Sequence, residues 1–159
     1  MTVEYGLDRI DRRILTALQA DGRMTNQALS EAVALSPSAC LARVRRMEQA
    51  GVIEGYHARL NPHALGPRLI LFAEVTLDRH HPADLARFEA VLANIPEIVE
   101  ASQVSGAFDY LLKVAVQDMP AWTRLEGNLM ERDPGVAKVT THVLLKKPKV
   151  FQGYPTGAS

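Results

Sequence analysis

Apolar residues recur at helical spacing in three short stretches within the first fifty residues. In the first, which follows Asp8, isoleucine or leucine stands at positions 10, 14, 15 and 18 until Asp21 interrupts the pattern. Thr25 is placed to cap a second, shorter helix. Ser36-Pro37 opens a third, because serine caps a helix well and proline fits its first position, and Gly51 ends it. The pattern predicts three helices with a tight turn before the third.

The third predicted helix has two unlike faces. We expect one face to pack against the protein interior, and it consists of Pro37, Cys40, Leu41, Val44 and Met47. The opposite face carries small and then basic side chains, namely Ser38, Ala39, Ala42, Arg43, Arg45 and Arg46. Small side chains let a helix enter a major groove, where arginines bind guanine edges or phosphates. The charges alone fit a solvated face equally well, but three short helices with this turn follow the helix-turn-helix plan, so we expect this face to bind double-stranded DNA.

The second half of the chain alternates apolar and polar residues, as strands do. Residues 69–77 are predicted as a strand, and a helix follows from Pro82 until Pro96. Two strands over 98–104 and 108–116, with a turn at 105–107, are followed by a helix over 118–132 and a strand over 136–145. This α+β order, βαββαβ, is the ferredoxin-like arrangement, with both helices on one face of an antiparallel sheet. The uncovered face is rich in apolar residues, so we expect it to pack against a second subunit.

These elements predict two domains. A helix-turn-helix domain over residues 1–60, winged-helix-like, would include a small wing strand pair in 52–60. Asn61-Pro62 through Gly66-Pro67 mark a linker over 61–68. The ferredoxin-like domain would then span 69–159.

Composition narrows the classes of function. Of the 159 residues 47% are hydrophobic and 23% charged, as in a folded chain with a core. The 18 basic and 18 acidic residues cancel, so DNA binding must come from a local patch such as the three arginines between Pro37 and Met47, a segment without acidic residues. One cysteine, Cys40, excludes an internal disulfide and a cysteine-built metal site. No apolar run is long enough to cross a bilayer, so we expect a cytoplasmic protein without a membrane partner.

Four segments carry a resemblance to a known family. They are LDRIDRRIL at 7–15, LSPSACLARVRRME at 35–48, GVIEGY at 51–56 and VSGAFDYLL at 104–112. Together they resemble the Lrp/AsnC regulators, also called leucine-responsive or feast/famine regulators, over nearly the whole chain. The resemblance implies a DNA-binding transcriptional regulator that responds to an amino acid or a similar small metabolite. It also implies homodimers that assemble into tetramers or octamers.

The resemblance places the effector between subunits, beside the hairpin loop with a Gly-x-x-Asp pattern. The candidate effector-binding residues are Val104, Ser105, Gly106, Ala107, Phe108, Asp109 and Tyr110. Gly106 permits a turn whose N–H groups can hold a carboxylate, and Asp109 can accept hydrogen bonds from an ammonium group. The alternative is that Gly106 only serves the hairpin and Asp109 caps its own loop.

Other chemistry has less support in the sequence. His80-His81 suggests a metal site, but adjacent residues rarely point at one ion and no partner is evident, so we expect a solvated loop, no metal and no cofactor. No acid–base or nucleophile–base set appears at motif spacing, so we do not expect an enzyme. Two alternatives share the fold: a sirohaem decarboxylase-like enzyme, and an architectural DNA-binding protein that ignores amino acids.

Overall fold

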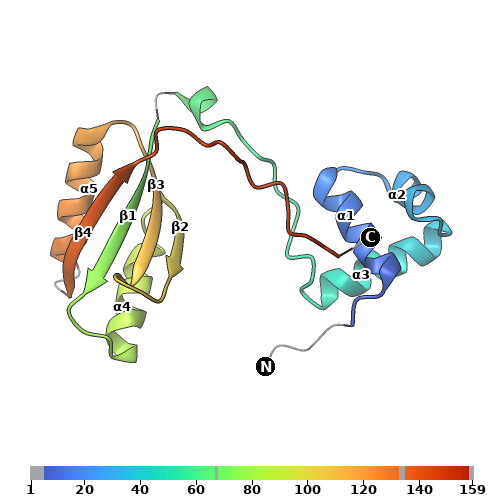
Figure 1. Ribbon diagram of the computed structural model, residues 1–159, viewed down its shortest axis with the longest axis horizontal. Coiled ribbons are helices and arrows are strands. Elements are labelled where there is room, and N and C mark those ends of the chain that lie inside the picture. Colours follow the sequence, from blue (N-terminus) through green and yellow to red (C-terminus); the bar gives the residue numbers. More distant parts are fainter. Residues whose placement is uncertain (1–5, 67, 133–134, 158–159) are drawn as a thin grey trace. The chain divides into compact units, whose positions relative to one another are not determined.

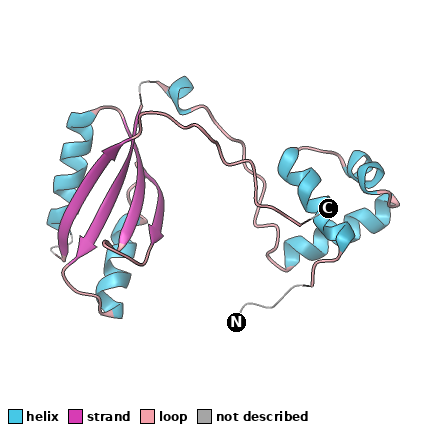
Figure 2. Cartoon of the chain, viewed as in Figure 1, coloured by secondary structure: helices cyan, strands magenta, loops and turns pink. Residues whose placement is uncertain are grey.

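The chain folds into two compact units. A computed structural model describes residues 6–66, 68–132 and 135–157. One unit spans residues 1–59 together with 149–159, and the other spans 60–148. Figure 1 labels the helices and strands, and Figure 2 shows that the first unit is helical while the second contains the sheet. Each unit is described by itself.

The three predicted helices of the first unit are confirmed. They are α1 (Arg9–Ala20), α2 (Asn26–Val33) and α3 (Pro37–Gln49), and their N-caps are Asp8, Thr25 and Ser36 as expected. The turn between α2 and α3 is tight because Ala34 adopts the left-handed conformation, with φ 58°. The buried core of this unit consists of Ile14, Leu29, Val33, Cys40 and Met47.

The predicted wing strand pair is wrong. The described residues 51–60 contain no strand. Gly51, with φ +70°, turns the chain back onto the end of α3, where the N–H groups of Val52 and Ile53 both donate to the Met47 carbonyl, at 2.9 and 3.2 Å. Both side chains also pack against the helical core. These N–H groups are therefore satisfied by the helix end and have no need of a strand partner.

The C-terminal segment lies with the first unit, whereas the sequence placed all of 69–159 in one domain. It packs along α1 through backbone and side-chain hydrogen bonds. The Gln19 amide donates to the Tyr154 carbonyl at 2.9 Å and accepts from the Tyr154 N–H at 2.6 Å. The Arg12 guanidinium donates to the Thr156 carbonyl at 2.7 Å. Polar side chains on the outer face of α1 therefore hold this tail.

The second unit has the predicted ferredoxin-like order. Its elements are a short 3-10 helix (Pro62–Leu65), β1 (Leu69–Leu77), α4 (Pro82–Leu92), β2 (Ile98–Gln103), β3 (Tyr110–Val116), α5 (Met119–Arg132) and β4 (Val136–Val143). The sheet order is β2-β3-β1-β4, and every neighbouring pair is antiparallel. The two central strands, β1 and β3, alternate buried and half-buried residues.

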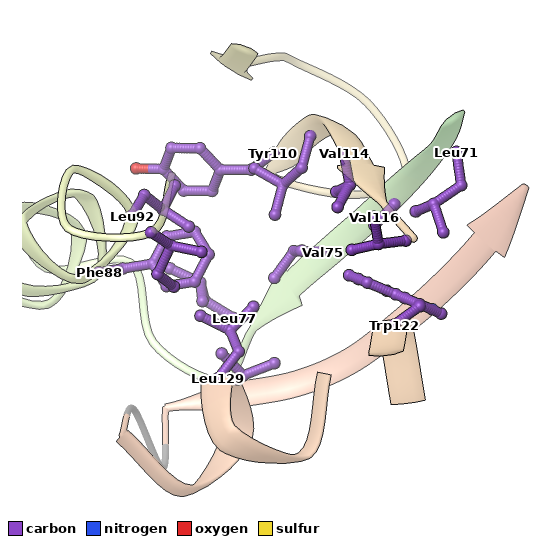
Figure 3. Close-up of a cluster of buried hydrophobic side chains, with 14 residues drawn as sticks. Leu71, Val75, Leu77, Phe88, Leu92, Tyr110, Val114, Val116, Trp122 and Leu129 are labelled. Atoms are coloured by element: carbon purple, nitrogen blue, oxygen red, sulfur yellow. The ribbon is translucent and has the colours of Figure 1, made fainter. Parts of the chain in front are cut away.

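One face of this sheet carries the core. Figure 3 shows side chains from α4 and α5, among them Phe88 and Trp122, gathered with the buried residues of β1 and β3. The Trp122 indole N–H donates to the Thr141 hydroxyl at 2.9 Å, which satisfies its buried polar group. The opposite face carries half-buried apolar side chains, namely Ile70, Phe72, Leu111 and Ala115. Among the described residues of this unit, no helix covers that face.

A methyl group at Gly153 should displace the tail from α1. Gly153 has φ +119°, and an added Cβ would meet the Gln19 side chain that bonds Tyr154. We expect Gly153→Ala to cost about 1–3 kcal/mol of stability in the first unit, measured by urea unfolding and by amide exchange at Tyr154. Gly127→Ala is the matched control, since Gly127 lies in α5 with open space around it. This substitution should stabilise the second unit by about 0.5–1 kcal/mol. An unchanged midpoint and slow Tyr154 exchange in Gly153→Ala would contradict this account of the tail.

Candidate nucleic-acid interface and effector loop

Helix α3 exposes most of the face predicted to bind DNA. Ser38, Ala39, Ala42 and Arg45 are exposed, whereas Cys40 and Met47 are fully buried. The inward assignment was wrong for Pro37 and Leu41, which are also exposed, Leu41 by 37%. The core contacts of α3 follow the i, i+4, i+7 line of Cys40, Val44 and Met47, and residues beside that line remain at the surface. The exposed N-terminal half of α3 is thus small and uncharged.

Arg43 was predicted to lie on this outward face, but its side chain extends toward α1 and pairs with two acids there. Its Nη1 lies 2.6 Å from Asp8 Oδ2 and 2.8 Å from Asp11 Oδ1, and its side chain is only 27% exposed. Arg46, 56% exposed, reaches the same carboxylate, with Nη2 3.1 Å from Asp11 Oδ2. Asp11 itself is fully buried. The structure therefore joins two of the three predicted arginines to acids of another helix.

Within this acid–arginine network, Asp8 and Arg43 stabilise each other's charge. The pKa of the Asp8 carboxyl is lowered, first by the hydrogen bond from the Asp11 N–H and then by Arg43. The pKa of Arg43 is raised by its hydrogen bonds to Asp8 and then to Asp11. Removing one partner of a buried ion pair typically costs about 3–5 kcal/mol, because a charge is left uncompensated. The network thus fixes how α3 packs on α1.

The hairpin loop is tied to the end of β1 through Asp109. The Asp109 Oδ2 atom accepts the Leu77 N–H at 2.8 Å, and its N–H donates to the Val75 carbonyl at 2.9 Å. Its other oxygen, Oδ1, lies 2.9 Å from His80 Nε2. His80 lies in an exposed loop as expected, with its side chain 61% exposed, but it also has a hydrogen-bond partner, Asp109, that the sequence did not indicate. Sequence alone gave no signal of this pair, since the two residues stand 29 positions apart.

The rest of the loop is open to solvent. Val104, Ser105, Gly106 and Ala107 are exposed, Phe108 is half-buried and Tyr110 is buried. Gly106 has φ +142°, and no heavy atom lies within 4 Å of where its Cβ would be. Glycine is favoured here by the backbone conformation and not by a lack of space for a side chain. The loop can therefore present backbone N–H groups to an incoming anion.

A hollow of about 300 Å³ lies beside the inner end of this loop. It is lined by Glu89, Leu92, Ala93, Ala101, Gln103 and Tyr110. The Tyr110 hydroxyl donates to Glu89 Oε1 at 2.9 Å, and burial together with this carboxylate raises the pKa of Tyr110 to about 12. Only Tyr110 among these residues was a predicted site residue. The others come from α4 and β2, and nothing in the sequence pattern marks them.

Neither a metal-ligand cluster nor a membrane-spanning helix is found among the residues that the structure describes. No group of three or more His, Cys, Asp or Glu side chains is arranged to hold a metal ion. No helix there is both long enough and apolar enough to span a membrane.

Known proteins resemble the chain in sequence over nearly its whole length. It is 50% identical over 143 residues to the leucine-responsive regulatory protein of Salmonella typhimurium, a match that covers 90% of this chain and 87% of that protein. Residues 70–153 match the Lrp/AsnC ligand binding domain, and residues 7–54 match a winged helix-turn-helix DNA-binding domain. The chain belongs to the Lrp/AsnC family. It is a transcriptional regulator of the Lrp/AsnC type, with a DNA-binding and a ligand-binding domain.

Solved structures of Lrp/AsnC regulators share this fold. An AsnC family regulator from Agrobacterium tumefaciens is 30% identical with a TM-score of 0.87, covering 95% of this chain and 98% of that one. A transcriptional regulator from Neisseria meningitidis, solved as a complex with L-Met, is 35% identical with a TM-score of 0.83, covering 91% of this chain and 93% of that one. The two-domain architecture is thus common to these regulators.

Proposed function

We propose that this Lrp/AsnC regulator binds operator DNA through the exposed face of α3, without catalysing a reaction. The observation that carries the proposal is the order of side chains on that face, which is small at Ser38, Ala39 and Ala42 and cationic at Arg45. A helix with such an N-terminal half can approach the floor of a major groove closely, where serine and alanine contact base edges and thymine methyl groups. Arg45 and the exposed part of Arg46 then meet guanine edges or phosphates.

We further propose that an amino acid or a related metabolite binds at residues 104–110. The open backbone around Gly106 suits a carboxylate, and Asp109 suits an ammonium group. Because the Leu77 N–H and His80 already use the Asp109 carboxylate, the incoming ammonium would displace the more exposed partner, His80. The L-Met complex of the Neisseria meningitidis relative supports an amino acid as the effector class.

Assembly into homodimers, and of dimers into tetramers or octamers, completes the proposal. The apolar face of the sheet, with Ile70, Phe72, Leu111 and Ala115, would pack against its copy in a second subunit. A dimer presents two α3 helices to half-sites about 34–36 Å apart, or a multiple of that spacing. The regulator would act in the cytoplasm, where its DNA lies.

Ala42→Glu tests the DNA-binding face. A carboxylate placed on the exposed centre of α3 would face phosphates and acceptor edges, and such like-charge contacts cost several kcal/mol. We expect affinity for a duplex selected from a random pool by the wild-type protein to fall about 100-fold or more, measured by fluorescence anisotropy at fixed salt. Ala20→Glu, an exposed position at the end of α1, makes the same change in charge and should have little effect. Equal affinities of the two variants would rule out α3 as the reader.

Asp109→Ala tests the effector loop. In a thermal-shift screen of the twenty amino acids, the wild-type protein should be stabilised by one or a few of them through linkage. Asp109→Ala should lose that stabilisation while still binding DNA, because the ammonium would have no carboxylate. Asp78→Ala, an exposed acid just after β1, is the control and should keep the response. A full response in Asp109→Ala would remove this residue from the site.

A further inference from the structure

The acids of α1 neutralise part of the DNA-binding helix. Arg43 and Arg46 share the carboxylates of Asp8 and Asp11, so these four charges sum to zero. Arg45 is exposed and, among the described residues, makes no ion pair. The three arginines that the sequence places together therefore differ in what they can offer to a duplex.

We propose that Asp8 and Asp11 withhold Arg43 from DNA, so that Arg43 is a positioning residue and the charged contacts come from Arg45 and the exposed part of Arg46. This inference rests on the proposed DNA binding through α3. Arg43 is mostly covered and is held by two carboxylate oxygens within 2.8 Å, so leaving them for a phosphate would strip the buried Asp11 of a counter-charge. Arg45 can bind a phosphate without breaking an ion pair with Asp8 or Asp11.

The withheld charge limits binding that is independent of sequence. Contacts to phosphates are independent of sequence, and each phosphate neutralised makes the slope of log K against log salt concentration more negative by about 0.9. A freed Arg43 would add such a contact to operator and non-operator DNA alike. Asp8 and Asp11 therefore lower the salt-dependent affinity of the regulator for every duplex and leave the ratio between specific and non-specific affinity unchanged.

Asp8 offers a way to free one positive charge of this network without unfolding the unit, since Arg43 and Arg46 would then share only the Asp11 carboxylate. The Asp8 side chain is 49% exposed, so its removal leaves no buried charge there. Its Oδ1 caps α1 by accepting the Asp11 N–H at 2.8 Å, while the other oxygen, Oδ2, holds Arg43. Asparagine caps helices as well as aspartate does. Asp8→Asn thus keeps the cap and replaces the oxygen that binds Arg43 with an amide group that cannot accept from it.

The experiment compares Asp8→Asn with Asp21→Asn. Asp21 is exposed at the other end of α1, accepts the Arg23 N–H, and forms no ion pair with α3. The Asp21→Asn substitution therefore makes the same change in net charge at another site. Binding to the selected operator and to a scrambled duplex is measured across a salt series. For Asp8→Asn we expect a slope more negative by about 0.9 for each subunit that engages the duplex, and a higher affinity for both duplexes at low salt. Asp21→Asn should keep the wild-type slope and affinities.

Glutamine variants of the two arginines provide a second arm. Arg45→Gln should make the slope less negative by about 0.9 per engaged subunit. Arg43→Gln, checked for folding by circular dichroism, should keep the wild-type slope. Indistinguishable slopes and affinities for Asp8→Asn and Asp21→Asn, or a less negative slope in folded Arg43→Gln, would overturn the inference while leaving DNA binding through α3 intact. Failure of the wild-type protein to bind any duplex would overturn both.

Discussion

The buried carboxylate of Asp11 is the constraint on which the DNA-binding unit depends. A carboxylate with no exposed surface is costly unless cationic or N–H donors surround it. Asp11 receives Arg43, Arg46 and the Asp8 N–H, and two of these donors belong to α3. Separating these donors from Asp11 would cost free energy, so they keep α3 at a fixed orientation on α1. The apolar core around Ile14 and Met47 contributes to the same packing.

The same principle operates in the second unit, where Asp109 holds the hairpin loop. In both places a carboxylate from one element receives donors from another, and the surface beside it is exposed. On α3 that surface consists of small side chains and Arg45, and at the loop it is the exposed backbone around Gly106. The difference lies in exposure. Asp11 is fully buried, whereas Asp109 is 20% exposed and pairs with His80, whose side chain is 61% exposed.

Local sequence patterns predicted the helices and strands, but they did not predict the polar contacts between residues far apart in the sequence. Helix caps and apolar periodicity gave the helices and strands, because capping and burial follow from neighbouring residues. The pairing of Arg43 with Asp8, 35 positions away, has no periodic signal, so three arginines looked alike in the sequence. The docking of the tail on Gln19 and the hydrogen bonding of Val52 to a helix end likewise depend on tertiary structure. The predicted wing and the predicted boundary of the second domain differ from the structure for this reason.

The most direct test of the account is cross-linking from the exposed face of α3 to DNA. A cysteine at position 42 is allowed to form a disulfide with a thiol tethered to a major-groove base of the selected operator, while Cys40 is buried and remains unreactive. We expect rapid cross-linking from Ala42→Cys and none from Ala20→Cys at the end of α1. Cross-linking from position 20 with none from position 42 would show that another surface meets the duplex.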